Sequence, residues 1–387
     1  MAAARRVLIV TEHPYPDHAT VRRNVRSLLD AGLAVDLVCL APLRARAGPT
    51  VDGAALRVHA LRMAHRRSGA LRYLQEYVGF WLWSFAICTS LSIRHRYASV
   101  LVDNPPDFVV FVSALARLRG ARVVLEMFEL VPELTAARMK LHARHPAIRI
   151  ARTVERASTS WADHVIVVSR QCQDVLVRRR VDRSKISVVP NSIPPAGPQA
   201  PGPPANGKPF IVTHCSLIER YGVQVAIEAM AHLRETRPDL VLRVLGEGEY
   251  KPRLVQLADE LGVADRVLFR GFRPWHDAMA EIREASVGIV AIIADGYGEL
   301  LLPTKLMEYA DNEVPVACAD LPTIAQHFPA HSLAYFTPGD AAQLARQIDH
   351  LLSHPSEARE QARRAKQAMR ALAWESVSPR YMAALGL

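Results

Sequence analysis

The sequence has few of the residues that build metal centres and disulfide frameworks. Its five cysteines, at positions 39, 88, 172, 215 and 318, are scattered and form no Cys-x-x-Cys pair. This excludes a zinc ribbon or a disulfide scaffold and favours a reducing compartment. Neither an Asp-x-Asp pair nor a His-Glu-x-x-His motif occurs, so we expect no tightly held catalytic metal.

Long apolar runs are also missing. The longest nearly uncharged stretch, residues 78–93, has 16 residues, whereas a membrane-spanning helix needs about 20. The first residues, Met-Ala-Ala-Ala-Arg-Arg, lack the apolar core of a signal peptide. We therefore expect a soluble or peripheral cytoplasmic protein. Half of the 387 residues are hydrophobic and 22% are charged, which excludes disordered and fibrous classes, and the length suits two domains.

Charge is divided unevenly along the chain. Residues 1–191 carry 29 Lys or Arg against 15 Asp or Glu, a balance of +14, while residues 192–387 carry 19 against 23, a balance of −4. Such asymmetry indicates an anionic partner for the first half: a membrane surface, a phosphorylated acceptor or nucleic acid. The alternative is a generally arginine-rich composition on solvated faces.

The chain reads as two α/β domains joined by a linker. Proline and glycine concentrate in residues 192–208, which indicates an extended linker. Short Val, Ile and Leu runs alternate with helical segments on both sides, with strands expected at 7–11, 35–40, 100–103, 122–127 and 164–169, then at 210–215, 241–245, 267–269, 287–293 and 314–318. This pattern predicts doubly wound parallel sheets, over 1–191 and 209–373, with a ligand between them at the carboxyl ends of the strands.

Residues 299–310 are the most informative segment, because they follow an expected strand and open a helix. Pro303 suits a first helical turn, and the free N–H groups of such a terminus attract phosphate. Lys305 adds a full positive charge. Glu308, one turn from Thr304, shares its face and offers a carboxylate to a ribose diol. On spacing alone, an ordinary amphipathic helix is an equal alternative.

The same segment, with the Val-Pro-Val-Ala-Cys-Ala-Asp stretch at 314–320, resembles the donor-site signature of family 4 retaining glycosyltransferases, which have the GT-B architecture of two Rossmann-like domains facing a central cleft. Further stretches agree in order, at 13–16, 21–24, 163–169, 188–191, 217–222, 246–249, 269–272 and 374–375. The resemblance covers nearly the whole chain. It implies that a helix over about 374–387 packs back on the first domain.

The resemblance also implies a set of site residues. The catalytic residues it implies are Arg220 and Lys305, which stabilise the leaving group, and Glu299, which stands beside the position of the family's first glutamate. Those that bind the donor are Glu308, Thr304, Leu306, Gly246, Gly248, Glu249, Ser216 and Phe272. Those on the acceptor side are His18, Arg22, Asn104, Phe128 and Glu129. His214 is more typical of a core or hinge position. No cofactor is implied, because the donor is itself a UDP- or GDP-sugar, and the acceptor is a lipid-linked glycan or a small molecule, not nucleic acid.

The sequence departs from the family pattern at several of these positions. The family pairs Glu308 with a glutamate eight residues earlier, where this chain has Leu300, with Glu299 beside it. Ser216 and Tyr221 replace the usual Arg and Lys near the diphosphate, and Phe128 replaces a His near the sugar. The chosen function is a retaining glycosyltransferase. A catalytically weak sugar-nucleotide-binding or partner subunit is the alternative, and a sugar-nucleotide epimerase is less favoured.

A basic and aromatic segment precedes residue 94. The arginines at 62, 66, 67 and 72 lead into a stretch with Tyr73, Tyr77, Phe80, Trp81, Trp83 and Phe85. This combination is typical of a helix at an anionic membrane surface, here the inner face, or beside an apolar acceptor cleft. A buried domain helix with a charged lead-in is an equal alternative.

Overall fold

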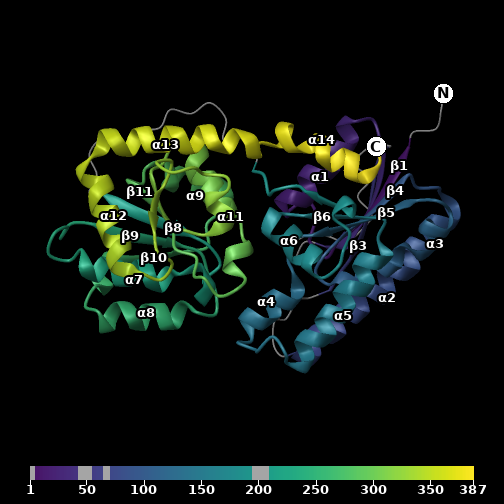
Figure 1. Cartoon of the computed structure of the whole chain (residues 1–387), viewed down its shortest axis with the longest axis horizontal. Helices are drawn as coiled ribbons and strands as arrows, with labels where there is room; N and C mark the ends of the chain where they lie inside the picture. The colour runs from purple at the N-terminus through teal and green to yellow at the C-terminus, as the bar shows by residue number, and fades with distance from the viewer. Residues whose placement is uncertain (1–4, 42–54, 64–69, 194–208) are drawn as a thin grey trace. The chain divides into compact units, whose positions relative to one another are not determined.

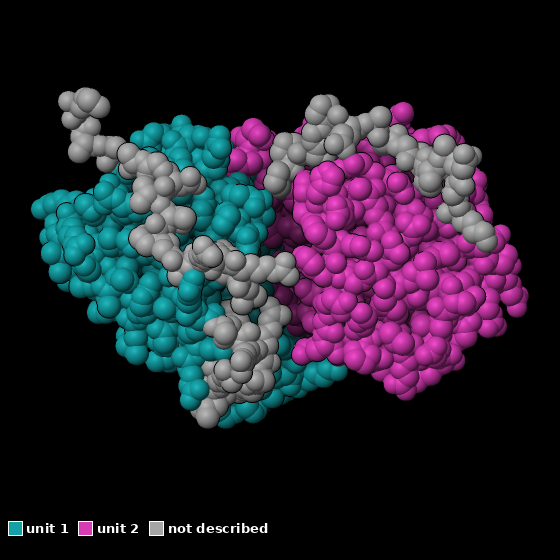
Figure 2. Space-filling view, turned by 180° about the vertical axis from the view of Figure 1, so that it is seen from behind, with its two compact units in different colours: residues 1–190, 377–387 teal, residues 191–376 magenta. Residues whose placement is uncertain are grey.

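The structure, a computed structural model, describes residues 5–41, 55–63, 70–193 and 209–387, and side chains are not described for 70–74. The chain divides into two compact units, Met1–Pro190 with Val377–Leu387, and Asn191–Ser376, which Figure 2 shows in separate colours. The predicted linker at 192–208 lies outside the described residues except for its first two positions.

The first unit is a parallel sheet of seven strands covered by helices. In chain order its elements are β1 (Arg6–Val10), α1 (Ala19–Asp30), β2 (Ala34–Leu40), β3 (Leu56–Leu61), α2 (Ala70–Arg94), β4 (Ser99–Asp103), the 3-10 helix η1 (Asp107–Ser113), α3 (Ala114–Leu118), β5 (Arg122–Met127), α4 (Val131–Arg138), α5 (Pro146–Trp161), β6 (His164–Val167), α6 (Arg170–Arg178), η2 (Arg183–Lys185) and β7 (Ile186–Val188). The strand order is β3-β2-β1-β4-β5-β6-β7. Figure 1 shows α2, α3 and α5 gathered on one side of this sheet and α1 on the other.

The second unit repeats the plan with six strands. Its elements are β8 (Phe210–His214), η3 (Glu219–Tyr221), α7 (Val223–His232), β9 (Val241–Leu245), α8 (Lys251–Glu260), η4 (Ala264–Arg266), β10 (Val267–Gly271), α9 (Trp275–Arg283), β11 (Val287–Val290), η5 (Gly298–Leu300), α10 (Thr304–Asp311), β12 (Val316–Ala319), α11 (Pro322–Ala325), β13 (Ala334–Phe336), α12 (Ala341–Ser353), α13 (Pro355–Met369), η6 (Arg370–Leu372) and α14 (Trp374–Leu385). The order is β10-β9-β8-β11-β12-β13.

Both sheets reverse their strand order at one point, between β1 and β4 and between β8 and β11. Every described strand pair is parallel, and the central strands are buried along their length, as β1, β4, β6 and β11 illustrate. This is the doubly wound α/β class that the apolar runs predict. The crevice at the reversal is where such sheets bind ligands, so the loops after β1, β4, β8 and β11 define the two places to search.

The last helix belongs partly to the first unit. From Val377 onward α14 is grouped with residues 1–190. Within that unit, Arg122 Nε donates to the carbonyl of Ala384 at 2.9 Å, and Tyr381 is fully buried. These contacts join the C-terminal segment to β5.

The basic and aromatic segment contains the 25-residue helix α2. Arg66 and Arg67 lie outside the described residues, as does the side chain of Arg72. Trp81 and Trp83 are half-buried, whereas Val78, Leu82 and Phe85 are exposed. Because these three positions are spaced by four and three residues, they form one apolar stripe on the helix, so α2 is not fully buried. Among the described helices, none is long and apolar enough to cross a membrane.

Candidate active site

The loops after β8, β9 and β10 are joined to one another at the carboxyl edge of the second sheet. Leu217 N–H donates to the carbonyl of Glu247 at 2.9 Å, and Gly246 N–H donates to that of Gly271 at 2.8 Å. A Cβ on Gly246, whose φ is +136°, would lie 1.9 Å from the carbonyl oxygen of Cys215, and one on Gly248 would lie 2.2 Å from that of Leu217. Both glycines are therefore required by the contact between these loops, whatever they also do for a donor.

Lys305 lies in the first turn of α10 and points into the unit beneath these loops. Its side chain is only 4% exposed. Its Nζ is 3.4 Å from the hydroxyl of Thr213 and 5.5 Å from the ring centre of Tyr221. No carboxylate pairs with it among the described residues. A buried cation without a counter-ion is costly, so this position suits an anionic ligand.

Arg220 is the second buried cation of the region, but it has a partner. Its Nε donates to Asp295 Oδ2 at 2.7 Å, and its guanidinium lies 4.7 Å from the ring centre of Tyr297. Asp295 is held in turn by the N–H groups of Tyr297 and Gly298, at 3.1 and 2.8 Å. Asp295 thus fixes Arg220 to the loop that precedes α10. The terminal nitrogens of Arg220 form no hydrogen bond within the described residues, so their donors are available to a ligand.

Glu308 is held from two sides. Its Oε2 lies 2.6 Å from His214 Nε2, and its Oε1 accepts from Trp275 Nε1 at 3.1 Å. The other imidazole nitrogen of His214 is 3.0 Å from the Tyr309 hydroxyl. Because an ionised carboxylate has about four acceptor sites, two remain for a diol. His214, expected to be a core or hinge residue, contacts the residue predicted to bind ribose.

The remaining predicted donor residues differ in how accessible they are. Thr304, Ser216 and Glu249 are exposed, and Phe272 is 76% exposed. Leu306 is fully buried and its N–H donates to the carbonyl of Pro303 at 3.1 Å, so its side chain is not presented to a ligand. Pro303 occupies the N-cap rather than the first turn. The carboxylate of Glu299 accepts from Gly296 N–H at 2.9 Å, and Leu300 is buried.

Three aromatic rings gather at the carboxyl edge of the first sheet. The rings of His13 and His18 stack with centres 3.9 Å apart, and Phe128 lies 5.7 and 6.2 Å from them. Burial, with Arg23 and Arg22 adding to it, lowers the pKa of His18 to about 4, so this ring is neutral at pH 7. His18 and Phe128, predicted from separate motifs, therefore lie together, and His13 joins them.

The other predicted acceptor-side residues position backbone. Asn104 is buried; its Nδ2 donates to the Glu129 carbonyl at 2.6 Å and its Oδ1 accepts from the Glu129 N–H at 3.2 Å. Arg22 donates to the Pro16 carbonyl at 2.9 Å. Asn104 thus joins the loops after β4 and β5, and Arg22 braces the loop after β1.

Glu12 lies two residues after the end of β1 and was not predicted as a site residue. Burial, and then the charge of Glu76 on α2, raise the pKa of Glu12 to about 9. Its Oε1 is buried and has no hydrogen-bond partner in the described part of the chain. A carboxyl that stays protonated at neutral pH therefore adjoins the His13 and His18 rings in sequence.

Known families match both halves of the chain. The family model described as "Glycosyl transferases group 1" matches residues 199–369, and that described as "Glycosyl transferase 4-like domain" matches residues 18–192. The chain belongs to the group 1 glycosyltransferases. This confirms that the resemblance seen in the donor segment is to a glycosyltransferase of this group.

Curated relatives of this glycosyltransferase are similar over part of their length. A putative colanic acid biosynthesis glycosyltransferase of Escherichia coli is 28% identical over 44% of this chain and 42% of its own. A GDP-mannose-dependent phosphatidylinositol monomannoside mannosyltransferase of Mycolicibacterium smegmatis is 32% identical over 34% and 38%, and a 2-deoxystreptamine glucosyltransferase of Streptomyces kanamyceticus is 24% identical over 55% and 56%. The matched segments span about two fifths to just over half of these relatives.

Solved structures match the glycosyltransferase over nearly its whole length. Sucrose-phosphate synthase from Thermosynechococcus elongatus has a TM-score of 0.76 at 18% identity, with 98% of each chain covered. Anabaena HepE in complex with UDP has a TM-score of 0.70 at 16% identity, with 98% of this chain and 99% of that one covered. At such identities the likeness shows the fold, which is GT-B.

The described residues around α10 bring several charged groups together. They contain no group of three or more His, Cys, Asp or Glu side chains that could bind a metal ion, and none of the five cysteines forms a disulfide bond. The groups brought together around α10 are instead two cations, one carboxylate and their supports, an arrangement that can hold a phosphorylated nucleoside.

Proposed function

We propose that this protein is a retaining glycosyltransferase that moves a sugar from a UDP- or GDP-sugar, bound on the second unit, to an acceptor bound on the first. The observation that carries the proposal is Lys305, a buried ammonium group with no carboxylate partner among the described residues. A diphosphate beside it would provide the missing negative charge. The N-terminus of α10, where Lys305 lies, adds positive charge, and so does Arg220, which directly precedes Tyr221.

The protein's task in this reaction is electrostatic. The bond between the sugar C1 and the diphosphate oxygen breaks, and the acceptor nucleophile bonds to C1 on the same face. The acceptor proton passes to the departing diphosphate, so no protein nucleophile is required. Lys305 and Arg220 stabilise the charge that develops on the phosphates, and Glu308 holds the ribose.

Two kinds of acceptor are compatible with the first unit. The exposed apolar stripe of α2 (Val78, Leu82 and Phe85) and the +14 balance of residues 1–191 support a lipid-linked acceptor at an anionic membrane surface. The His13, His18 and Phe128 rings would suit a small-molecule acceptor equally well. The relatives include proteins named for a phosphatidylinositol mannoside and for 2-deoxystreptamine, so both classes are carried forward.

Nucleotide binding is the first experiment. UDP, GDP and ADP should be compared by thermal shift, because a ligand at 100 times its Kd stabilises the folded state by about 2.7 kcal/mol. We expect UDP or GDP to raise Tm and ADP to have little effect. The matching sugar nucleotide should then be hydrolysed slowly without acceptor. Binding without hydrolysis would favour the alternative of a catalytically weak binding subunit, to which Phe128 and Leu300 point, and no binding would refute the proposal.

A further inference from the structure

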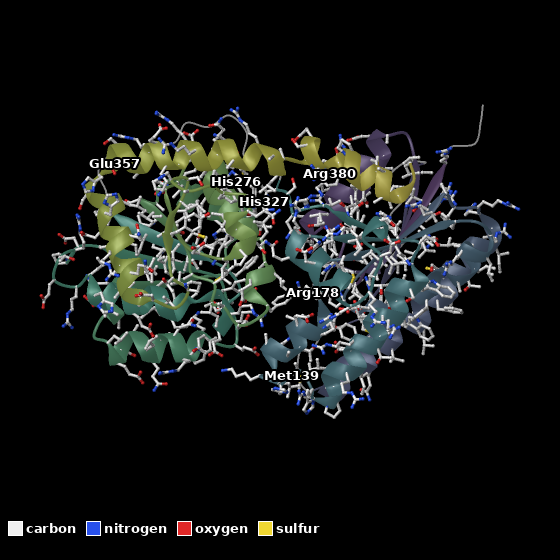
Figure 3. The ribbon with its side chains drawn as sticks, viewed as in Figure 1. Met139, Arg178, His276, His327, Glu357 and Arg380 are labelled. Atoms are coloured by element: carbon white, nitrogen blue, oxygen red, sulfur yellow. The ribbon has the colours of Figure 1, made fainter. Side chains whose placement is uncertain are left out.

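A cavity lies in the first unit, and none of the predicted site residues lines it. It has a volume of about 270 Å³ and opens between α5 and the C-terminal end of α6. Five arginines contribute to its lining: Arg152, Arg156, Arg178, Arg179 and Arg180. Arg178, the last residue of α6, is labelled in Figure 3.

The carboxylate in the lining of this cavity already has an ion-pair partner. Glu155, the acidic residue of the lining, is buried and pairs with Arg179, whose Nη1 lies 2.6 Å from both carboxylate oxygens. Arg179 also pairs with Glu133 of α4. The other four arginines are exposed and form no ion pair within the described ranges. The lining therefore keeps an excess of positive charge.

Local structure does not account for this excess. A cation near the C-terminus of a helix is favourable by about 0.3–1 kcal/mol, which explains Arg178. Arg152 and Arg156 lie in the middle of α5, four residues apart, where like charges on one face cost a few tenths of a kcal/mol. Arg180, two residues after α6 ends, has a φ of +70°, a conformation in which glycine is usual. Arg152 and Arg156 thus lack a role in helix stability, and Arg180 adopts a φ that is unfavourable for arginine.

The cavity lies toward the amino ends of the strands, whereas the acceptor-side residues follow their carboxyl ends. α6 starts just after the carboxyl end of β6 and has nine residues, so it carries the chain about 13 Å back toward the amino edge. Gln173, midway along α6, donates to the carbonyl of Ile186, the first residue of β7. Asn104 and Phe128, by contrast, follow the carboxyl ends of β4 and β5.

We propose that this cavity, the arginine cavity, binds a phosphate group: a phosphate monoester or diphosphate, either free or as the headgroup of an anionic lipid. Guanidinium groups match phosphate oxygens two at a time, and four of them here form no ion pair within the described residues. The volume is just below the range of about 300–1,000 Å³ typical of pockets for larger organic ligands, so it suits a small anion. A ligand bound here would anchor or regulate the protein rather than take part in transfer of the sugar.

The test compares two variants of the full chain that lose the same charge. Arg156→Ser/Arg178→Ser changes the arginine cavity. Arg234→Ser/Arg359→Ser is the control, because these exposed arginines lie in the second unit and form no ion pair within the described ranges. Inorganic pyrophosphate binding is measured by calorimetry in a Lys305→Met background, so that the proposed donor site does not contribute. Sedimentation with phosphatidylglycerol and phosphatidylcholine vesicles is the second arm.

We expect the cavity variant to bind pyrophosphate at least tenfold more weakly than the control at low salt. If it also stops sedimenting with phosphatidylglycerol vesicles while the control still does, the ligand is a lipid headgroup; if both variants treat vesicles alike, it is a soluble phosphate. Equal pyrophosphate affinity and equal sedimentation in the two variants would overturn the proposal. Neither result bears on nucleotide binding at Lys305, so the two proposals fail separately.

Discussion

Replacing His214 by alanine tests how Glu308 is held for the ribose. In the structure His214 Nε2 lies 2.6 Å from one carboxylate oxygen of Glu308, and Trp275 Nε1 lies 3.1 Å from the other. An ionised carboxylate can only accept, so the imidazole Nε2 carries the proton of this bond. His214→Ala removes the shorter contact and leaves the indole as the remaining side-chain donor to the carboxylate.

The expected loss follows from the rotational freedom that Glu308 regains. A released side-chain torsion has three staggered wells, and the apparent affinity of a ligand falls with the fraction of protein in the competent state. One released torsion therefore raises the Kd for the nucleotide about threefold. His214→Ala combined with Trp275→Phe, which keeps an aromatic ring but no donor, releases a second torsion and raises it about ninefold.

Glu308→Gln provides the upper limit of the series. It removes a hydrogen bond to a charged acceptor, worth about 1.5–3 kcal/mol, or roughly 10–150-fold in Kd. His276→Ala is the matched control, since this neighbouring histidine is exposed and contacts Asp277 rather than Glu308; it is labelled in Figure 3. Calorimetry with UDP and GDP should give Kd values that decrease in the order Glu308→Gln, double variant, His214→Ala, His276→Ala. Wild-type Kd values for His214→Ala and the double variant, with Glu308→Gln weakened, would refute the positioning role.

Three further predictions concern charge. Lys305→Met should lower turnover more than about tenfold while leaving the Tm of the empty protein equal or higher, because it removes a buried charge without a partner; a fall in Tm would show that an anion is not what Lys305 lacks. Arg220→Ala should lower turnover by more than about tenfold, and Asp295→Asn should lower it less; equal rates for wild type and Arg220→Ala would exclude Arg220 as a leaving-group contact. Because the pKa of Glu12 is raised from 4.5 to about 9, the native state keeps a proton that the unfolded chain releases, and the free energy of unfolding falls as pH rises across that window. Glu12→Gln should therefore raise Tm relative to wild type at pH 8 by an amount that disappears at pH 4, as a pair of melting curves would show.

The fold could be predicted wherever strands are continuous apolar runs. Each strand expected from such a run is present, although β11 ends at Val290 rather than at residue 293. β3, β7 and β13 were missed. β3 has an exposed Arg57 within it, and β7 and β13 have three residues each, too few to show a pattern. These strands include three of the four sheet edges, where burial on both faces is incomplete and the sequence is less constrained.

The candidate site could be predicted only where its residues are neighbours in sequence. Lys305 and Glu308 lie in one helical turn, so the spacing is visible. The partners of these residues come from far along the chain: His214 is 94 positions from Glu308, Trp275 is 33 from it, and Asp295 is 75 from Arg220. A histidine after a strand and a tryptophan at the start of a helix have common structural roles, so nothing local distinguishes them.

Arg220 and Lys305, the two buried cations, differ in how their charge is compensated when no ligand is bound. Asp295 neutralises Arg220 before any ligand binds, so the cost of burying its charge is already compensated. For a diphosphate, Arg220 therefore offers mainly hydrogen-bond donors that are held in a fixed direction. Lys305 has no such partner, and the free energy of burying its charge is recovered only when an anion binds. An anionic ligand therefore gains most of its charge stabilisation at the first turn of α10, where Lys305 lies. During transfer, negative charge grows on the same diphosphate, so an interaction with Lys305 that is favourable on binding becomes stronger as the bond to the sugar breaks, which is the condition for accelerating the reaction rather than only retaining the donor.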